Sequence, residues 1–151
     1  MISIRCPLPV DTASLGARLA AHLRAGDIVA LSGPLGSGKT LFTGGIASGL
    51  GVEELVTSPS FILVRQYLSG FLPLIHADVY RLSTQNEFDD LDLIDESADG
   101  VLVIEWGDAV EGILPPDHLK VGFGVDPDNT RVVTFDGPEE RWSEMSLEFD
   151  S

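Results

Sequence analysis

Residues 33–40 read GPLGSGKT and fit the pattern G-x-x-x-x-G-K-[ST] at every position. The pattern needs glycines because the backbone curls around a phosphate group with its N–H groups pointing inward, a conformation that larger side chains would obstruct. An unbroken apolar run, Ile28–Leu31, precedes the loop, and a helix is expected directly after it, over Thr40–Leu50. This strand–loop–helix order is typical of a phosphate-binding P-loop, so the segment predicts a nucleotide-binding α/β fold.

The loop residues have separate expected roles in binding ATP and Mg²⁺. The Lys39 ammonium group would reach the β- and γ-phosphates, and the Thr40 hydroxyl would ligate the magnesium ion. The helix that begins near Lys39 adds the positive end of its dipole. The residues expected to contact the nucleotide are Gly33, Gly36, Ser37, Gly38, Lys39, Thr40 and Leu41.

Outside this loop, apolar segments separated by turn residues predict the rest of the sheet and its helices. The expected strands are Ile2–Ile4, Ile28–Leu31, Phe61–Tyr67, Leu72–Ala77, Val101–Ile104, Leu119–Val125 and Arg131–Phe135, the last two forming a hairpin. The expected helices run from Asp11 or Thr12 to Gly26 and over Thr40–Leu50, Asn86–Leu93 and Pro138–Met145. No repeat or long linker divides the chain. We therefore predict a single P-loop domain over residues 1–151, a three-layer α/β sandwich with a mainly parallel central sheet and an antiparallel C-terminal hairpin.

The composition is that of a globular protein with a strongly acidic surface. The chain has 151 residues, of which 44% are hydrophobic, and a formal net charge of -15. Such a field repels polyanions, so independent, tight nucleic-acid binding is not expected. Cys6 is the only cysteine, which excludes an intrachain disulfide. Because the N-terminus lacks a secretory signal and no apolar run approaches the length of a membrane span, a cytoplasmic protein without membrane contact is predicted.

Two acidic residues follow predicted strands and are candidates for the catalytic and metal site. Hydrolysis needs a carboxylate near the metal, usually at the end of a neighbouring strand. Glu105 directly follows Val101–Ile104, although an ordinary solvated acid fits this position equally well. Asp78, after the next apolar run, would emerge at the same edge of the sheet, with a turn aspartate as the alternative. His76 is more typical of a structural histidine, and no other His or Cys lies near enough in sequence to suggest a zinc site.

Two further segments have a plain interpretation and a functional one. The motif TSPSF, residues 57–61, lies where many P-loop proteins carry a loop that senses the γ-phosphate, and the hydroxyls of Thr57, Ser58 and Ser60 could supply ligands for it. Position alone favours an ordinary loop. The acidic stretch Glu87–Asp99 contains no base. It fits a solvated face, or a docking surface for a basic partner.

Four motifs, GPLGSGKT, TSPSF, HADVYRL and VIEWGD, occur in this order within roughly Ile28–Asp108. Together they resemble the TsaE (YjeE) family, bacterial P-loop ATPases required to make threonylcarbamoyladenosine at adenosine 37 of tRNAs that read ANN codons. The resemblance implies an ATPase that does not itself make the modified base. It implies a subunit that associates with the TsaD and TsaB proteins, where ATP binding and hydrolysis support multiple turnover of the threonylcarbamoyl transferase. Such a subunit would be a weak ATPase alone, stimulated by its partners.

The resemblance also assigns roles to individual residues. It implies that Lys39 and Thr40 hold phosphate and Mg²⁺. Glu105 would complete the metal site, and Asp78 would be needed for hydrolysis. Trp106 resembles a functional tryptophan of the family.

The same resemblance concerns segments outside the central site. It makes Thr57–Phe61 a nucleotide-responsive switch and brings Asp11 and Arg131 close to the base. The chain departs from the usual family residues at Pro34, which replaces an acid, at Leu41, which replaces a frequent second threonine, and at Ser60, which replaces a threonine. These departures put in doubt any role of those side chains in metal geometry or turnover.

Three alternatives to an ATPase remain at the level of sequence. A small-molecule kinase normally brings several arginines in a lid, whereas the seven arginines of this chain are scattered. A GTPase is disfavoured because no N-K-x-D motif is present, and Lys120 lies in the sequence DHLK instead. The third alternative is an interaction module that binds nucleotide merely to set its shape. Phosphate release with and without the partner pair distinguishes this module from an ATPase.

Overall fold

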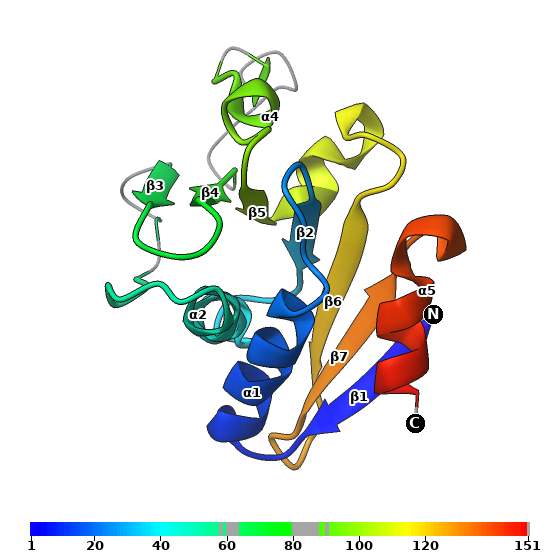
Figure 1. Ribbon diagram of the computed structural model, residues 1–151. Helices are drawn as coiled ribbons and strands as arrows, with labels where there is room; N and C mark the ends of the chain where they lie inside the picture. The colour runs from blue at the N-terminus through cyan, green and yellow to red at the C-terminus, as the bar shows by residue number, and fades with distance from the viewer. Residues whose placement is uncertain (58, 60–63, 80–87, 90, 151) are drawn as a thin grey trace.

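The computed structural model describes residues 1–57, 59, 64–79, 88–89 and 91–150. Within them, seven strands form one sheet in the order β1-β7-β6-β2-β5-β4-β3 (Figure 1). β6, β2, β5 and β4 run parallel, β7 pairs antiparallel with both β6 and β1, and β3 pairs antiparallel with β4. The strands are β1 (Ile2–Cys6), β2 (Ile28–Ser32), β3 (Val64–Tyr67), β4 (Leu74–Asp78), β5 (Val101–Glu105), β6 (Leu119–Val125) and β7 (Arg131–Asp136). The predicted α/β class, with a parallel centre and an antiparallel C-terminal hairpin, is confirmed.

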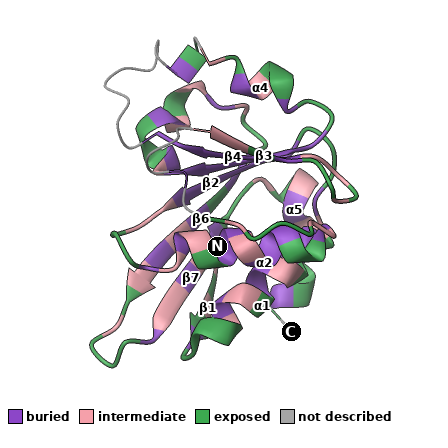
Figure 2. Ribbon diagram, turned by 90° about the vertical axis from the view of Figure 1, so that its left-hand side faces the viewer, coloured by how far each residue is buried: buried purple, intermediate pink, exposed green. Residues whose placement is uncertain are grey.

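Helices cover both faces of the sheet, which gives the three predicted layers (Figure 2). In β2, Val29 and Leu31 belong to the apolar core on one face, and Ile28 and Ala30 belong to the core on the other. Burial on both faces explains why the apolar run of this strand is unbroken. One face carries α1 (Pro9–Ala20), α2 (Lys39–Gly49) and α5 (Glu139–Phe149), and the other carries α4 (Leu93–Glu96) and the 3₁₀ helix η1 (Gly107–Ile113).

The predicted limits of the first helix are wrong at both ends. α1 begins at Pro9 and ends at Ala20. It begins early because proline favours the first helical turn, where its missing N–H is not needed. After Ala20 the N–H groups of residues 21–23 bond to carbonyl oxygens three residues back, and the chain then turns at Gly26, which has φ +92°. Leu23 continues the apolar spacing of the helix and is buried, although it lies beyond the helix end. The spacing therefore predicted too long a helix.

Other boundaries shift for local reasons. β4 begins at Leu74, two residues late, because Pro73 has no N–H to donate to a neighbouring strand. α5 extends four residues past the predicted end at Met145, burying Phe149. The helix η1 was not predicted. The expected helix Asn86–Leu93 and the start of the strand Phe61–Tyr67 lie partly outside the described residues. Within that helix Phe88 and Asp89 are helical, and α4 begins at Leu93. Where the chain is described, no helix is long and apolar enough to cross a membrane.

The position of α2, and with it the glycine-rich loop, depends on close contact with α1. A Cβ atom added to Gly45 would lie 2.0 Å from the backbone oxygen of Ala13. One added to Gly16 would lie 2.2 Å from the backbone oxygen of Phe42. The two helices therefore touch backbone to backbone, and only residues without a side chain fit at these two positions.

We expect Gly45→Ala to destabilise the protein by about 1–3 kcal/mol, because the new methyl group must push α1 and α2 apart. The neighbouring Gly44→Ala is the matched control, since a Cβ there meets nothing within 4 Å. It should raise stability by about 0.5–1 kcal/mol through the higher helix propensity of alanine. Chemical denaturation of both variants measures the difference. Equal stabilities would contradict the helix contact described here.

Candidate functional site

The glycine-rich loop joins the end of β2 to the start of α2, in the predicted order. Gly38 is the N-cap of α2 and has φ +108°, in the left-handed region that residues with a side chain rarely adopt. At Gly33 the constraint is space, because a Cβ there would lie 2.6 Å from the backbone oxygen of Phe123 on β6. Ser37 is fully buried, and its hydroxyl has no hydrogen-bond partner in the described part of the structure. The loop backbone therefore has little free space on the side that faces the sheet.

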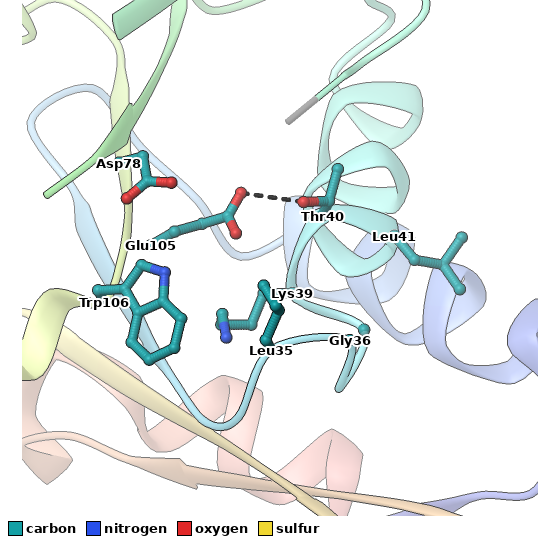
Figure 3. Close-up of a pocket in the computed structure, with 9 residues that line it drawn as sticks. Leu35, Gly36, Lys39, Thr40, Leu41, Asp78, Glu105 and Trp106 are labelled. Carbon is teal, nitrogen blue, oxygen red and sulfur yellow. Dashed lines mark hydrogen bonds between the residues drawn. The ribbon is translucent and has the colours of Figure 1, made fainter. Parts of the chain in front are cut away.

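A cleft of about 250 Å³ opens beside this loop (Figure 3). The residues around it come from the loop, from the start of α2 and from the ends of β4 and β5. They are Leu35, Gly36, Gly38, Lys39, Thr40, Leu41, Asp78, Glu105 and Trp106. The cleft therefore brings together most of the residues that the sequence assigned to phosphate, metal and catalysis.

Lys39 is held by the loop that precedes it. Its Nζ atom donates to the backbone oxygens of Gly33, at 2.6 Å, and Pro34, at 3.0 Å, and lies 4.0 Å from the centre of the Trp106 ring. Burial lowers the pKa of Lys39, and the negative charges of nearby residues, Glu105 foremost, act against this shift. The ammonium group is thus placed inside the loop, where oxygens of a bound phosphate could replace the two carbonyl oxygens.

The two acidic candidates meet at the same edge of the sheet. Asp78 ends β4 and Glu105 ends β5, and the two are directly paired in the register of these parallel strands. Both are buried, with exposed fractions of 6% and 4%. Glu105 accepts a hydrogen bond on Oε2 from the Thr40 hydroxyl at 3.1 Å, which connects the end of β5 to the first turn of α2 (Figure 3).

The donor set fits a magnesium ion that arrives with a nucleotide. Mg²⁺ keeps several waters and is usually held by one or two protein oxygens together with phosphate oxygens. The Thr40 hydroxyl and the Glu105 carboxylate provide two such oxygens in contact with each other. Among the described residues, no group of three or more His, Cys, Asp or Glu side chains could hold a metal by itself. The arrangement therefore suits Mg²⁺ bound to phosphates better than an all-protein metal site.

Trp106 reaches the cleft through an unusual backbone conformation. Its φ of +63° is in the left-handed region, which is rare for a bulky residue. Trp106 is the N-cap of η1, directly after β5, and its indole ring lies next to the Lys39 ammonium group. A strained backbone at such a place suggests a functional constraint.

The remaining predicted residues make different contacts. Arg131, at the start of β7, donates from Nη2 to the backbone oxygen of Gly36 at 3.1 Å and so contacts the loop. Asp11 instead accepts a hydrogen bond from the backbone N–H of Leu8 at 2.9 Å, which caps α1, and it does not line the cleft. The Thr57 N–H donates to the Tyr67 hydroxyl at 3.4 Å. Ser58 and Ser60 lie outside the described residues.

The sequence interpretation missed the contact that His76 makes. This fully buried residue of β4 places its Nε2 atom 2.6 Å from Oε2 of Glu105. A signal was available, because residues two apart on a strand share a face and His76 precedes Asp78 by two. The cross-strand partner could not be read from the sequence without the pairing of β4 with β5.

Comparisons with known proteins match most of this chain to one family. The family model described as "Threonylcarbamoyl adenosine biosynthesis protein TsaE" matches residues 7–133. A Streptomyces coelicolor protein named "tRNA threonylcarbamoyladenosine biosynthesis protein TsaE" is 46% identical over 136 residues, covering 85% of this chain and 92% of that protein. A Bacillus subtilis protein of the same name is 38% identical over 142 residues, covering 93% and 88%.

A solved structure is similar over nearly the whole chain. The crystal structure of YdiB from Bacillus subtilis superposes with a TM-score of 0.82 at 32% sequence identity. The match covers 99% of this chain and 93% of that one. The similarity thus extends beyond the glycine-rich loop to the C-terminal hairpin and α5.

Proposed function

The chain belongs to the TsaE family and takes part in tRNA threonylcarbamoyladenosine biosynthesis, and within that pathway we propose that it binds and hydrolyses ATP with Mg²⁺. The observation that carries the proposal is the convergence of Lys39, Thr40, Asp78 and Glu105 on one cleft beside a P-loop. We propose that the protein acts as a subunit supporting the transferase that modifies adenosine 37 of tRNAs reading ANN codons.

The proposed mechanism assigns one task to each side chain. The N–H groups of residues 36–40 and the Lys39 ammonium group would bind the β- and γ-phosphates. Thr40 and Glu105 would hold Mg²⁺, which when bound neutralises charge that develops on the transferred group. Asp78, beside Glu105 at the end of β4, would orient the attacking water through its carboxylate.

Water is a better acceptor than a metabolite at this site because none of the described arginines lines the cleft. A kinase needs several arginines around the transferred phosphoryl group. Of the arginines described, Arg131 contacts the loop, whereas Arg5, Arg18 and Arg141 pair with acids away from the cleft. Substrate-dependent ADP formation without free phosphate would favour the kinase instead.

The proposed partners are the TsaD and TsaB proteins, and they provide the test of this function. The purified chain should release phosphate from ATP slowly by itself and faster when the partner pair is added. A chain that binds ATP but releases no phosphate in either condition would be a nucleotide-dependent interaction module. A chain that binds no ATP would contradict the proposal altogether.

We expect nucleotide binding to change the fluorescence of Trp106. Its ring lies 4.0 Å from the Lys39 ammonium, which would turn toward phosphate when ATP binds. The other tryptophan, Trp142, is buried in α5 and donates to the backbone oxygen of Asp117, away from the cleft. Titration with Mg–ATP should therefore change the emission of the wild type and of Trp142→Phe, but not of Trp106→Phe. A change that persists in Trp106→Phe would place the nucleotide elsewhere.

A further inference from the structure

His76 has a position in the site that the proposed reaction does not yet explain. It lies on β4 with no exposed surface, and its register partner on β5 is Val103, two residues before Glu105. The 2.6 Å distance between its Nε2 atom and Oε2 of Glu105 is that of a strong hydrogen bond. Ordinary core packing does not require a buried polar side chain to form a hydrogen bond with a proposed metal ligand, so this contact connects His76 to the site.

The direction of this hydrogen bond follows from the chemistry of the two groups. A carboxylate that serves as a metal ligand is ionised and only accepts hydrogen bonds, so in this role of Glu105 the proton lies on Nε2 of His76. The other ring nitrogen, Nδ1, is buried and has no hydrogen-bond partner in the described part of the structure. The bond to Glu105 is therefore the one hydrogen bond recorded for this imidazole among the described residues.

Two donors thus meet on the same oxygen atom of Glu105. Oε2 accepts from His76 at 2.6 Å and from the Thr40 hydroxyl at 3.1 Å, and these donors come from β4 and α2. Neither bond uses Oε1. A carboxylate fixed through one oxygen from two sides has little freedom to rotate, so its second oxygen has a defined position.

We propose that His76 is a positioning residue that fixes the Glu105 carboxylate for the magnesium ion of the bound nucleotide. The inference rests on the proposed function, because it gives a role toward that metal. Hydrogen-bond partners of metal ligands typically contribute roughly 10- to 100-fold in metal affinity or activity. His76 would exert this effect through Glu105, without touching the nucleotide.

The test compares His76→Phe with His76→Gln. Phenylalanine fills a similar volume but has no donor, whereas the glutamine amide can donate close to the position of Nε2. Binding of a non-hydrolysable ATP analogue is followed while Mg²⁺ is titrated. We expect the Mg²⁺ concentration at half-saturation to rise roughly 10- to 100-fold in His76→Phe. His76→Gln should restore most of the loss, and binding of the analogue without Mg²⁺ should be equal in all three proteins.

A double variant separates positioning from a general effect on packing. In the Glu105→Gln background, His76→Phe should change the Mg²⁺ midpoint little further, because the carboxylate that it positions is already gone. An equal midpoint for His76→Phe and the wild type, or no recovery in His76→Gln, would overturn the inference while leaving the proposed function intact. A wild type that binds no analogue at any Mg²⁺ concentration would instead remove the proposed function, and the inference with it.

Nitrogen NMR of the wild type measures the position of the proton on the His76 ring directly. The chain has three histidines, so the signals of His76 can be assigned by their absence in a single variant. We expect a proton on Nε2 of His76. A ring protonated on Nδ1 alone could not donate to Glu105 and would overturn the proposal.

Discussion

Replacing Lys39 by methionine should abolish about half or more of the thermal stabilisation that Mg–ATP gives the protein. A ligand at 100 times its dissociation constant stabilises the folded state by about 2.7 kcal/mol. Each hydrogen bond between a charged group and a phosphate oxygen contributes about 1.5–3 kcal/mol. The loss of the Lys39 ammonium should therefore weaken binding at least about tenfold, and the shift in Tm with nucleotide should shrink accordingly.

The measurement is the difference in Tm with and without Mg–ATP, because Lys39 also contributes to the protein without ligand. Its bonds to the backbone oxygens of Gly33 and Pro34 are lost in the variant, so the absolute Tm can change for that reason alone. Lys120→Met is the matched control. Lys120 is the other lysine of the chain, and it pairs with Glu111 outside the cleft. An unchanged nucleotide-dependent shift in Lys39→Met would refute the phosphate assignment.

The glycine-rich loop and the central strands could be predicted because their physical requirements are local. Gly38 needs a left-handed φ, and the apolar runs that became β2 and β5 are buried on both faces. Such constraints leave a pattern in consecutive residues. Helix ends leave a weaker pattern: α1 ends at Ala20, although the apolar spacing continues to the buried Leu23.

Contacts between strands could be predicted only where the direction of the strands is enough to say which strand ends meet. Asp78 and Glu105 each come at the end of an apolar run, which predicts their meeting at one edge of a parallel sheet, and the register pairs them. The contact of Arg131 with Gly36 depends on the order β7-β6-β2 within the sheet. The contact of His76 with Glu105 depends on which strand lies beside β4. No local pattern in the sequence indicates which strands are neighbours in the sheet.

Replacing Glu105 by glutamine should separate ATP binding from hydrolysis. The P-loop and Lys39 would still hold the phosphates, so affinity for the nucleotide should stay within roughly tenfold of the wild type. The amide keeps the size of the side chain but loses the negative charge that Mg²⁺ prefers. Loss of one preorganised electrostatic group costs on the order of 10²- to 10³-fold in kcat. We therefore expect hydrolysis stimulated by the partner pair to fall by at least about 100-fold.

Asp108→Asn is the matched control for this experiment. Asp108 is exposed in η1 and acts on Lys39 by charge alone, and it does not line the cleft. Its replacement removes one carboxylate from the neighbourhood without changing the proposed metal ligands, so stimulated hydrolysis should change by no more than a few-fold. If both variants kept full activity with the partners, Glu105 would have no place in the metal site. If both lost activity equally, the effect would come from the local negative charge and not from the position of Glu105 at the end of β5.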